Sequence, residues 1–90
     1  MTMEYRIEVR VTPRRGILDP QGKAVGGALA SLGFDGVSEV HVGRLVVFTL
    51  AAASEEDALS QAEAMCRQLL ANPVTEDYDV RLGEPAEAAR

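Results

Sequence analysis

The run 65–78 constrains the fold most, because it encodes the end of a helix, a stop and the start of a strand. Leu69 and Leu70 extend an apolar helical stripe. Asn72 and Pro73 end it, since asparagine tolerates the left-handed conformation of a helix C-terminus and proline cannot continue the ladder. Alternate residues beyond the stop share an apolar strand face, with one acidic exception. They are Val74, Glu76, Tyr78, Val80 and Leu82. We therefore expect this corner to dock another molecule.

The length and charge of the chain bound its class. Ninety residues predict one small domain, which we place at 1–82, with a frayed tail at 83–90. A net charge of −5 argues against nucleic acid, which requires a basic footprint. The single cysteine allows no internal disulfide, and no run approaches the roughly 20 apolar residues that span a bilayer. We expect a cytoplasmic protein without a membrane partner.

Two segments of the first third show clear periodicity. Residues 3–12 alternate between apolar and charged side chains, which predicts a strand with one buried face. Asp19 then provides an N-cap and Pro20 the first position of a helix that should end at Gly33. The predicted inward stripe of this helix is Val25, Ala28, Leu29 and Leu32. Gly22, Gly26 and Ala30 recur every four residues, and because helical glycines cost up to about 1 kcal/mol each, they indicate close approach of another backbone.

The stretch from Val37 to Ala52 allows two interpretations. A tight turn at Gly43 and Arg44 would make it a hairpin of two strands. Apolar residues keep one parity straight through Gly43, however, and a slip of one residue would have reversed that pattern. They are Val40, Val42, Val46, Phe48 and Leu50. We favour one long strand bent near Gly43, with the hairpin as the alternative, and expect such a long strand to reach a second subunit.

A second helix completes the fold class. Ser54 is its predicted N-cap, followed by acidic residues that complement the helix dipole. Its predicted apolar stripe is Leu59, Ala62, Cys66 and Leu69, with Met65 and Leu70 beside them. The element order is β-α-β-(β)-α-β. This order predicts an α+β two-layer sandwich, ferredoxin-like or a strand-sharing variant, with two helices on one face of an antiparallel sheet.

The chain offers candidate interface residues rather than a catalytic set. Cys66 lies on a buried stripe and is expected to be a packed thiol, and His41 is the only histidine. Arg44 is the only cation on an apolar strand face, which places it at the rim or opposite a carboxylate of another subunit. The candidate interface residues are Arg14, Arg15, Lys23, Arg44, Asn72, Glu76, Asp77 and Tyr78.

Three motifs at matching spacing point to one known family. They are Leu18-Asp19-Pro20-Gln21-Gly22, Val42-Gly43-Arg44, and Met65-Cys66 followed by the run from Leu69 to Tyr78. Spread over residues 4–82, they resemble the PurS family, the small subunit of phosphoribosylformylglycinamidine (FGAM) synthase. The chain departs from the family pattern at Arg44, where lysine is common, in its more basic Arg14-Arg15 pair and in its alanine-rich tail.

The resemblance implies a non-catalytic subunit of a glutamine-hydrolysing ligase complex in purine biosynthesis. Such a subunit bridges a glutaminase, which releases ammonia, and a larger ATP-dependent synthetase, which consumes it. It forms homodimers, sometimes dimers of dimers, and supports ammonia transfer. The complex uses ATP and magnesium, and no cofactor is expected on this chain. The alternative function is an ACT-like regulatory module that binds a small molecule, because ACT domains share the same element order.

Overall fold

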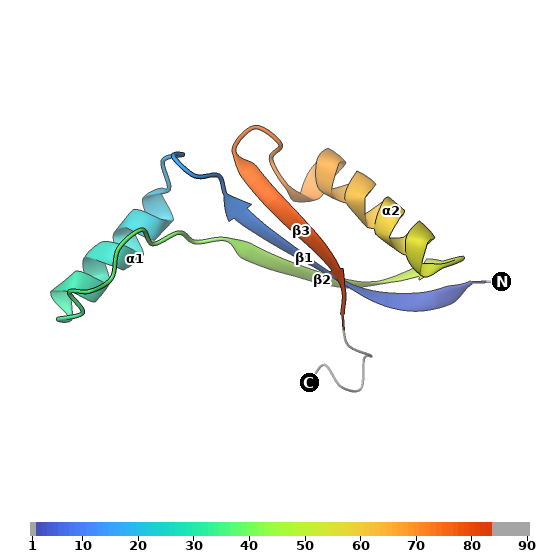
Figure 1. Cartoon of the computed structure of the whole chain (residues 1–90), viewed down its shortest axis with the longest axis horizontal. Helices are drawn as coiled ribbons and strands as arrows, with labels where there is room; N and C mark the ends of the chain where they lie inside the picture. The colour runs from blue at the N-terminus through green and yellow to red at the C-terminus, as the bar shows by residue number, and fades with distance from the viewer. Residues whose placement is uncertain (1, 84–90) are drawn as a thin grey trace.

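The computed structural model describes residues 2–83, which form an antiparallel sheet and two α-helices (Figure 1). The strands are β1 (Met3–Pro13), β2 (Arg44–Ala52) and β3 (Glu76–Leu82). The helices are α1 (Pro20–Ser31) and α2 (Glu55–Met65), and a π-helical turn, η1 (Cys66–Leu70), continues α2. This confirms the α+β class. Apart from Gly83, the predicted frayed tail lies outside the described residues. No helix within residues 2–83 has the length and apolar character needed to cross a membrane.

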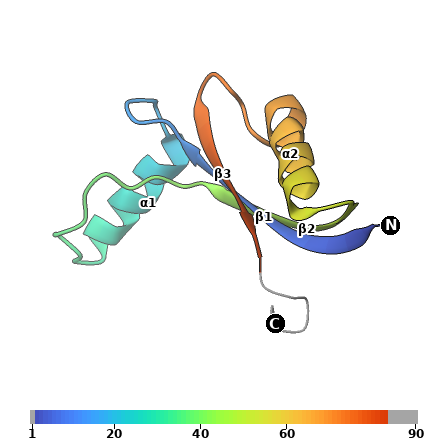
Figure 2. The ribbon, with the colours of Figure 1, turned by 45° about the vertical axis from the view of Figure 1, so that its right-hand side comes forward.

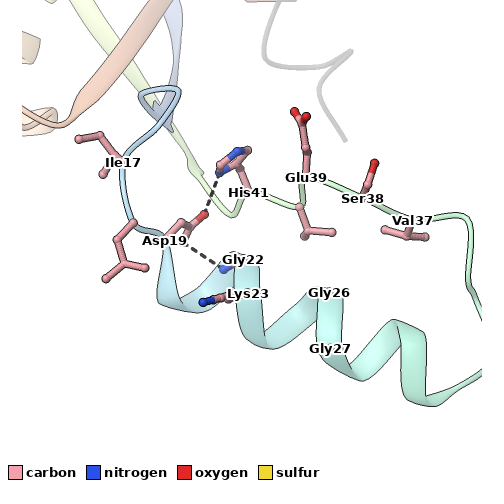
Figure 3. Close-up of a pocket in the computed structure, with 12 residues that line it drawn as sticks. Ile17, Asp19, Gly22, Lys23, Gly26, Gly27, Val37, Ser38, Glu39 and His41 are labelled. Atoms are coloured by element: carbon pink, nitrogen blue, oxygen red, sulfur yellow. Dashed lines mark hydrogen bonds and ion pairs between the residues drawn. The ribbon is translucent and has the colours of Figure 1, made fainter.

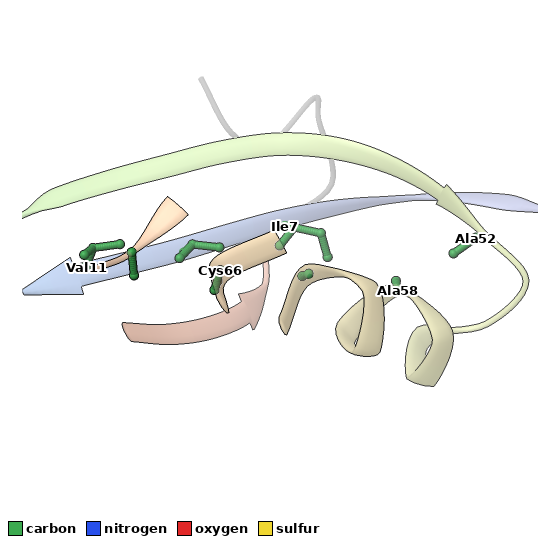
Figure 4. Close-up of a cluster of buried hydrophobic side chains, with 8 residues drawn as sticks. Ile7, Val11, Ala52, Ala58 and Cys66 are labelled. Atoms are coloured by element: carbon green, nitrogen blue, oxygen red, sulfur yellow. The ribbon is translucent and has the colours of Figure 1, made fainter. Parts of the chain in front are cut away.

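β1 is the central strand of the sheet and pairs antiparallel with both neighbours, in the order β2-β1-β3. The register places Val9 opposite Val46 on one side and Val80 on the other. Because side chains alternate along a strand, this register gathers apolar residues from all three strands on one inner face. The buried residues centre on β1 and α2 (Figure 4). They are Ile7, Val9, Val11, Ala52, Ala58, Ala62, Cys66 and Ala71.

α2 covers the inner face of the sheet because its contact side chains are small. Ala58, Ala62 and Cys66 recur every four residues and are fully buried against the sheet. At the N-terminus of the helix, the Ser54 hydroxyl accepts a hydrogen bond from the Asp57 N–H at 3.0 Å, as expected for an N-cap. The Asp57 carboxylate in turn accepts from the Ala53 N–H at 3.1 Å.

The predicted stripe of α2 was wrong at its first and last positions. Ala58 is buried in the core in place of Leu59. Leu69 is 82% exposed, whereas Leu70 packs against the core. The π-helical turn explains the change, since the Ala71 N–H donates to the Cys66 carbonyl five residues back, at 3.1 Å. One wider turn rotates the following side chains relative to an α-helical register, so that the second leucine faces inward.

α1 stands away from the sheet, beyond the end of β1 (Figures 1 and 2). The radius of gyration is 16.5 Å, against about 12 Å for a compact chain of this length. The expectation that both helices lie on one face is therefore corrected within one protomer, where only α2 covers the sheet. Val25 and Leu32, on the predicted inward stripe of α1, are 42% and 72% exposed.

The neighbour of α1 within the chain is the segment 37–42, which runs back along it. A Cβ on Gly22 would overlap the Val40 carbonyl oxygen, and one on Gly26 would lie 3.4 Å from Val40 Cγ2. This confirms the close backbone approach predicted from the glycine spacing. As predicted, Asp19 caps the helix and Gly33, with a φ of 97°, follows its end.

The segment 37–52 is neither one long strand nor a hairpin in this protomer. β2 begins only at Arg44, and the residues before it pair with no strand among residues 2–83. Two features account for this. The segment extends past the end of β1, and Glu39 adopts a φ of 54°, which interrupts an extended backbone. Gly43 sits so close to β1 that a Cβ there would overlap the Val11 carbonyl oxygen.

Candidate protein-docking corner

Six of the eight candidate interface residues surround the loop between η1 and β3. They are Arg14, Arg44, Asn72, Glu76, Asp77 and Tyr78, and we call this cluster the corner. They come from β2, from β3, from the loop after β1 and from the loop before β3. Arg15 lies in the turn before α1 and Lys23 lies on α1, so both are outside the corner.

Arg44 and Glu76 form the central ion pair of the corner. Two guanidinium nitrogens of Arg44 donate to the two carboxylate oxygens of Glu76 at 2.9 and 3.0 Å. Arg44 also donates to the Leu70 carbonyl at 2.6 Å, so it ties the end of η1 to both strands. Hydrogen bonding to Glu76 raises the pKa of Arg44, and hydrogen bonding from Arg44 lowers the pKa of Glu76. The carboxylate that Arg44 meets in the protomer belongs to the same chain, and the half-exposed Arg44 side chain lies at the rim, which is one of the two positions that the sequence allowed.

Asn72 organises the loop that follows η1. Its side-chain oxygen accepts from the Val74 N–H at 3.0 Å, and its carbonyl accepts from the Glu76 N–H at 2.8 Å. Its own N–H donates to Glu76 at 2.8 Å, which is the second cause of the lowered pKa of that carboxyl. An asparagine side chain closes such turns by accepting from the backbone two residues on. Asn72 is thus a structural element of the corner.

Arg14 braces the corner from the other side of the sheet. Its guanidinium donates to the Pro73 carbonyl at 2.7 Å and lies 3.4 Å from the Asp77 carboxylate, and its backbone N–H donates to the Thr75 carbonyl at 2.9 Å. Asp77 and Glu76 point to opposite faces, as their adjacency in a strand predicts. Each of these two carboxylates is paired with an arginine of this chain, so neither presents an unpaired negative charge at the corner.

The corner presents two apolar side chains that the sequence reasoning did not select. Val74 is 74% exposed at the loop, and Leu69 is exposed on the adjoining turn of η1. Tyr78, by contrast, packs against the core, and its hydroxyl lies 3.4 Å from Glu63 of α2. The signal that could have identified Leu69 was the surplus of apolar residues at the end of α2, where two successive leucines cannot both face the core. The corner is therefore a braced loop with an apolar tip, Leu69 and Val74.

A concave region lies between α1 and the segment 37–42, which runs back along it (Figure 3). It has a volume of about 380 Å³, and Lys23 is among its lining residues. Asp19 accepts from the Gly22 N–H at 3.0 Å and from the Val42 N–H at 2.9 Å, and lies 3.4 Å from His41 Nδ1. The Gly22 hydrogen bond, then the Val42 hydrogen bond, lower the pKa of Asp19. Its carboxylate thus already occupies the helix N-terminus.

Cys66 is a packed thiol, as predicted. Its side chain is fully buried under α2, and burial raises the pKa of the thiol. A raised pKa keeps the sulfur protonated, and the thiolate is the reactive form. The residue therefore contributes to packing.

Comparisons with known proteins agree with the resemblance. The model of the PurS family, described as phosphoribosylformylglycinamidine (FGAM) synthase, matches residues 6–84. The phosphoribosylformylglycinamidine synthase subunit PurS of Synechocystis sp. is 46% identical over 78 residues, which cover 87% of this chain and 78% of that relative.

Two solved structures share the fold. The PurS subunit of Thermotoga maritima superposes with a TM-score of 0.83 at 25% identity, covering 92% of this chain and 95% of that one. A chain of the PurLQS structure from the same organism gives a TM-score of 0.82 at 26% identity, covering 90% and 99%. The match of the family model to nearly the whole described chain establishes that this protein belongs to the PurS family.

Proposed function

We propose that this chain is the non-catalytic PurS subunit of FGAM synthase, a glutamine-hydrolysing ligase complex of purine biosynthesis. In this role it bridges the glutaminase and the ATP-dependent synthetase and supports the transfer of ammonia between them. Two enzymes that pass on a small neutral intermediate gain from being held in a fixed arrangement, because the intermediate then reaches the second site before it diffuses away.

The observation that carries the proposal is the agreement of sequence and fold with PurS chains, including one from a PurLQS complex. The corner adds a physical reason for a role in assembly. The carboxylates and guanidiniums of the corner bind one another or the backbone of the same chain. What faces outward is an apolar tip on a loop held by several hydrogen bonds, and a pre-organised apolar anchor loses little entropy on binding a protein.

We assign the tip, Leu69 and Val74, to contact with the synthetase or the glutaminase, and the corner residues to holding it in place. Arg15 and Lys23 are exposed basic residues on the α1 side, where they suit an acidic partner surface. The interface roles of all eight candidate residues thus fall into two classes, bracing at the corner and direct contact near α1.

Self-association is part of the proposed function. A chain that leaves large apolar side chains exposed along one helix requires a covering surface. In this chain these side chains extend from the loop before α1 to the loop after it. They are Ile17, Leu18, Val25, Leu32, Phe34 and Val37. A homodimer, with a dimer of dimers as the next level, would bury them.

We place ATP and magnesium on the synthetase and no cofactor on this chain, and we place the complex in the cytoplasm. The ACT-like alternative receives no support from the family model or from the PurS relatives described above. A thermal-shift screen with free amino acids addresses it directly. A flat response is expected for a PurS subunit, and stabilisation by an amino acid would favour the ACT-like reading.

Reconstitution with the cognate synthetase and glutaminase tests the proposed function. Glutamine-dependent FGAM synthesis should require this chain, whereas synthesis from free ammonia by the synthetase should not. This contrast separates a bridging role from a catalytic role in the synthetase reaction, since loss of a group that catalyses that reaction would abolish both activities. Full glutamine-dependent turnover without the chain would overturn the proposal.

A further inference from the structure

The dipeptide Asp35-Gly36 lies in the turn that joins α1 to the segment 37–42. This turn is at the end of α1 farthest from the sheet (Figure 1), and both residues are exposed. Within the described chain, 2–83, no hydrogen bond or ion pair involves residues 35–39. A Cβ on Gly36 would also contact nothing within 4 Å. The backbone on both sides of the peptide bond that joins the two residues can therefore rotate.

An amide that follows an aspartate can attack the side chain of that aspartate. The Gly36 nitrogen bonds to Cγ of Asp35 and closes a succinimide ring, while the hydroxyl of the protonated carboxyl group leaves and takes the amide proton as water. Such an intramolecular attack is fast where the backbone can bring the two reacting atoms together. The unbonded turn around Asp35 meets this requirement.

Water then opens the ring in one of two ways. Attack at Cγ restores aspartate, whereas attack at the backbone carbonyl carbon of Asp35 gives isoaspartate, in which the chain continues through the side chain. One water molecule leaves and one enters, so the mass of the protein does not change. No metal, cofactor or oxidant takes part in either step.

Glycine is the residue that favours ring closure most, because it has no Cβ to shield its nitrogen and adopts a wide range of backbone angles. Asp35 is the only aspartate of the chain that precedes a glycine. Asp19 and the single asparagine, Asn72, each precede a proline, which has no N–H to give up.

The other aspartates lie in regular secondary structure, which holds the amide that follows each of them. Asp57 precedes Ala58, whose N–H donates to the Ser54 carbonyl at 2.9 Å. Asp77 and Asp79 lie in β3, where pairing with β1 fixes the backbone. The turn at Asp35 thus differs from every other position of this kind in residues 2–83.

We infer that Asp35 is a site of spontaneous covalent modification, at which the folded chain forms isoaspartate through a succinimide with Gly36. Isoaspartate adds one methylene to the backbone. The fold should survive this change, because residues 35–39 make no hydrogen bond that a longer backbone would break. The inference does not depend on the proposed function.

Uptake of heavy oxygen in the native chain tests the inference. The protein is kept at neutral pH in water enriched in oxygen-18, and trypsin is then added in ordinary water. Cleavage after Lys23 and Arg44 releases residues 24–44, in which Asp35 is the only aspartate or asparagine. This peptide should gain oxygen-18 and separate chromatographically into aspartate and isoaspartate forms.

The remaining tryptic peptides are internal references. Residues 16–23, 45–67 and 68–81 contain all the other aspartates and the asparagine, and they should stay unlabelled. An unlabelled 24–44 peptide, or equal labelling of all four peptides, would overturn the inference. This measurement uses the native chain, so it does not depend on how any variant folds.

Gly36→Ala is the matched variant. The added Cβ has open space in the folded chain, so the fold should be kept, but it hinders attack by the nitrogen. Labelling of the 24–44 peptide should be several-fold slower in this variant, with an unchanged circular dichroism spectrum. Equal rates in the two chains would exclude the succinimide route through Gly36.

Enzymatic methylation identifies the product independently. A carboxyl methyltransferase specific for isoaspartate moves the methyl group of S-adenosylmethionine to the free carboxylate and releases S-adenosylhomocysteine. The aged native chain should accept radiolabelled methyl groups, and aged Gly36→Ala should accept several-fold fewer. Failure of the aged native chain to accept methyl groups would refute isoaspartate formation.

Discussion

The two helices have similar length and similar amphipathic patterns, yet only one is covered in the protomer. α2 lies on the sheet through Ala58, Ala62 and Cys66, all fully buried, whereas the apolar face of α1 is open to solvent. Sequence periodicity predicts that a face will be buried, but it does not specify which chain buries it. What distinguishes α1 is its connections. Gly43 leads straight from the segment 37–42 into β2, so α1 is carried beyond the end of the sheet.

Substitutions in the core and on α1 should differ most strongly in their effect on stability. Ile7→Ala should lower the free energy of unfolding by about 2–5 kcal/mol, because it opens a cavity in the fully buried centre of the sheet. Val25→Ala should reduce stability only at protein concentrations at which the chain self-associates. Urea unfolding across a dilution series measures both variants. A Val25→Ala effect that persists in the monomer would mean that α1 is packed within one chain.

Paired glycine substitutions test the packing of α1 against the segment 37–42. Gly22→Ala should lower the free energy of unfolding by about 1–3 kcal/mol, since its Cβ would meet the Val40 carbonyl and force the backbone to move. Gly27→Ala is the matched control, because its Cβ would contact nothing within 4 Å. Alanine should stabilise the helix there by up to about 1 kcal/mol. Equal thermal unfolding midpoints for the two variants would contradict the close contact.

One carboxylate in each region should make stability depend on pH. The pKa values of Glu76 and Asp19 are lowered in the folded chain, so both favour folding in their ionised form. Their contribution is complete above the ordinary carboxyl range near pH 4–4.5 and is lost as pH falls through their lowered pKa values. Unfolding followed from pH 6 to pH 2 should show this loss. Glu76→Gln and Asp19→Asn should each reduce the loss of stability between pH 4 and pH 2. An unchanged loss in both variants would show that these two carboxylates do not cause the pH dependence.

The smallest effect on folding is expected at the corner tip. Leu69→Ser and Val74→Ser should change the free energy of unfolding by no more than about 0.5 kcal/mol, because both side chains are exposed. The double variant should nevertheless bind the synthetase or the glutaminase more weakly in a pull-down. Gln68→Ser, at a neighbouring exposed position, is the control. Undiminished binding by the double variant would exclude the tip as a contact.

Features local in the sequence made much of the fold predictable. Alternation identified β1, the Asp19 and Ser54 caps fixed the starts of both helices, and four-residue glycine spacing signalled the approach of Val40. These features depend on neighbours in sequence, whose geometry a single chain determines.

The features that escaped prediction depend on longer-range geometry. Arg44 meets Glu76 because η1 and β3 return to the start of β2, and no spacing along the chain reveals that return. The exposed position of Leu69 follows from one π-helical turn, which apolar periodicity does not encode. The predicted strand at 37–52 had the right parity but only half its length in β2, because the other half lies beyond the end of β1.

The burial of Cys66 makes this chain convenient for spectroscopy. The only native thiol is sealed beneath α2 and protonated, so it should resist maleimide reagents while the fold is intact. A single cysteine placed at Ser38 or Gln68 would then carry a fluorophore or spin label at one defined position without removal of the natural residue. Distances between labelled copies, and between a labelled copy and its larger neighbours, become measurable in the unmodified background.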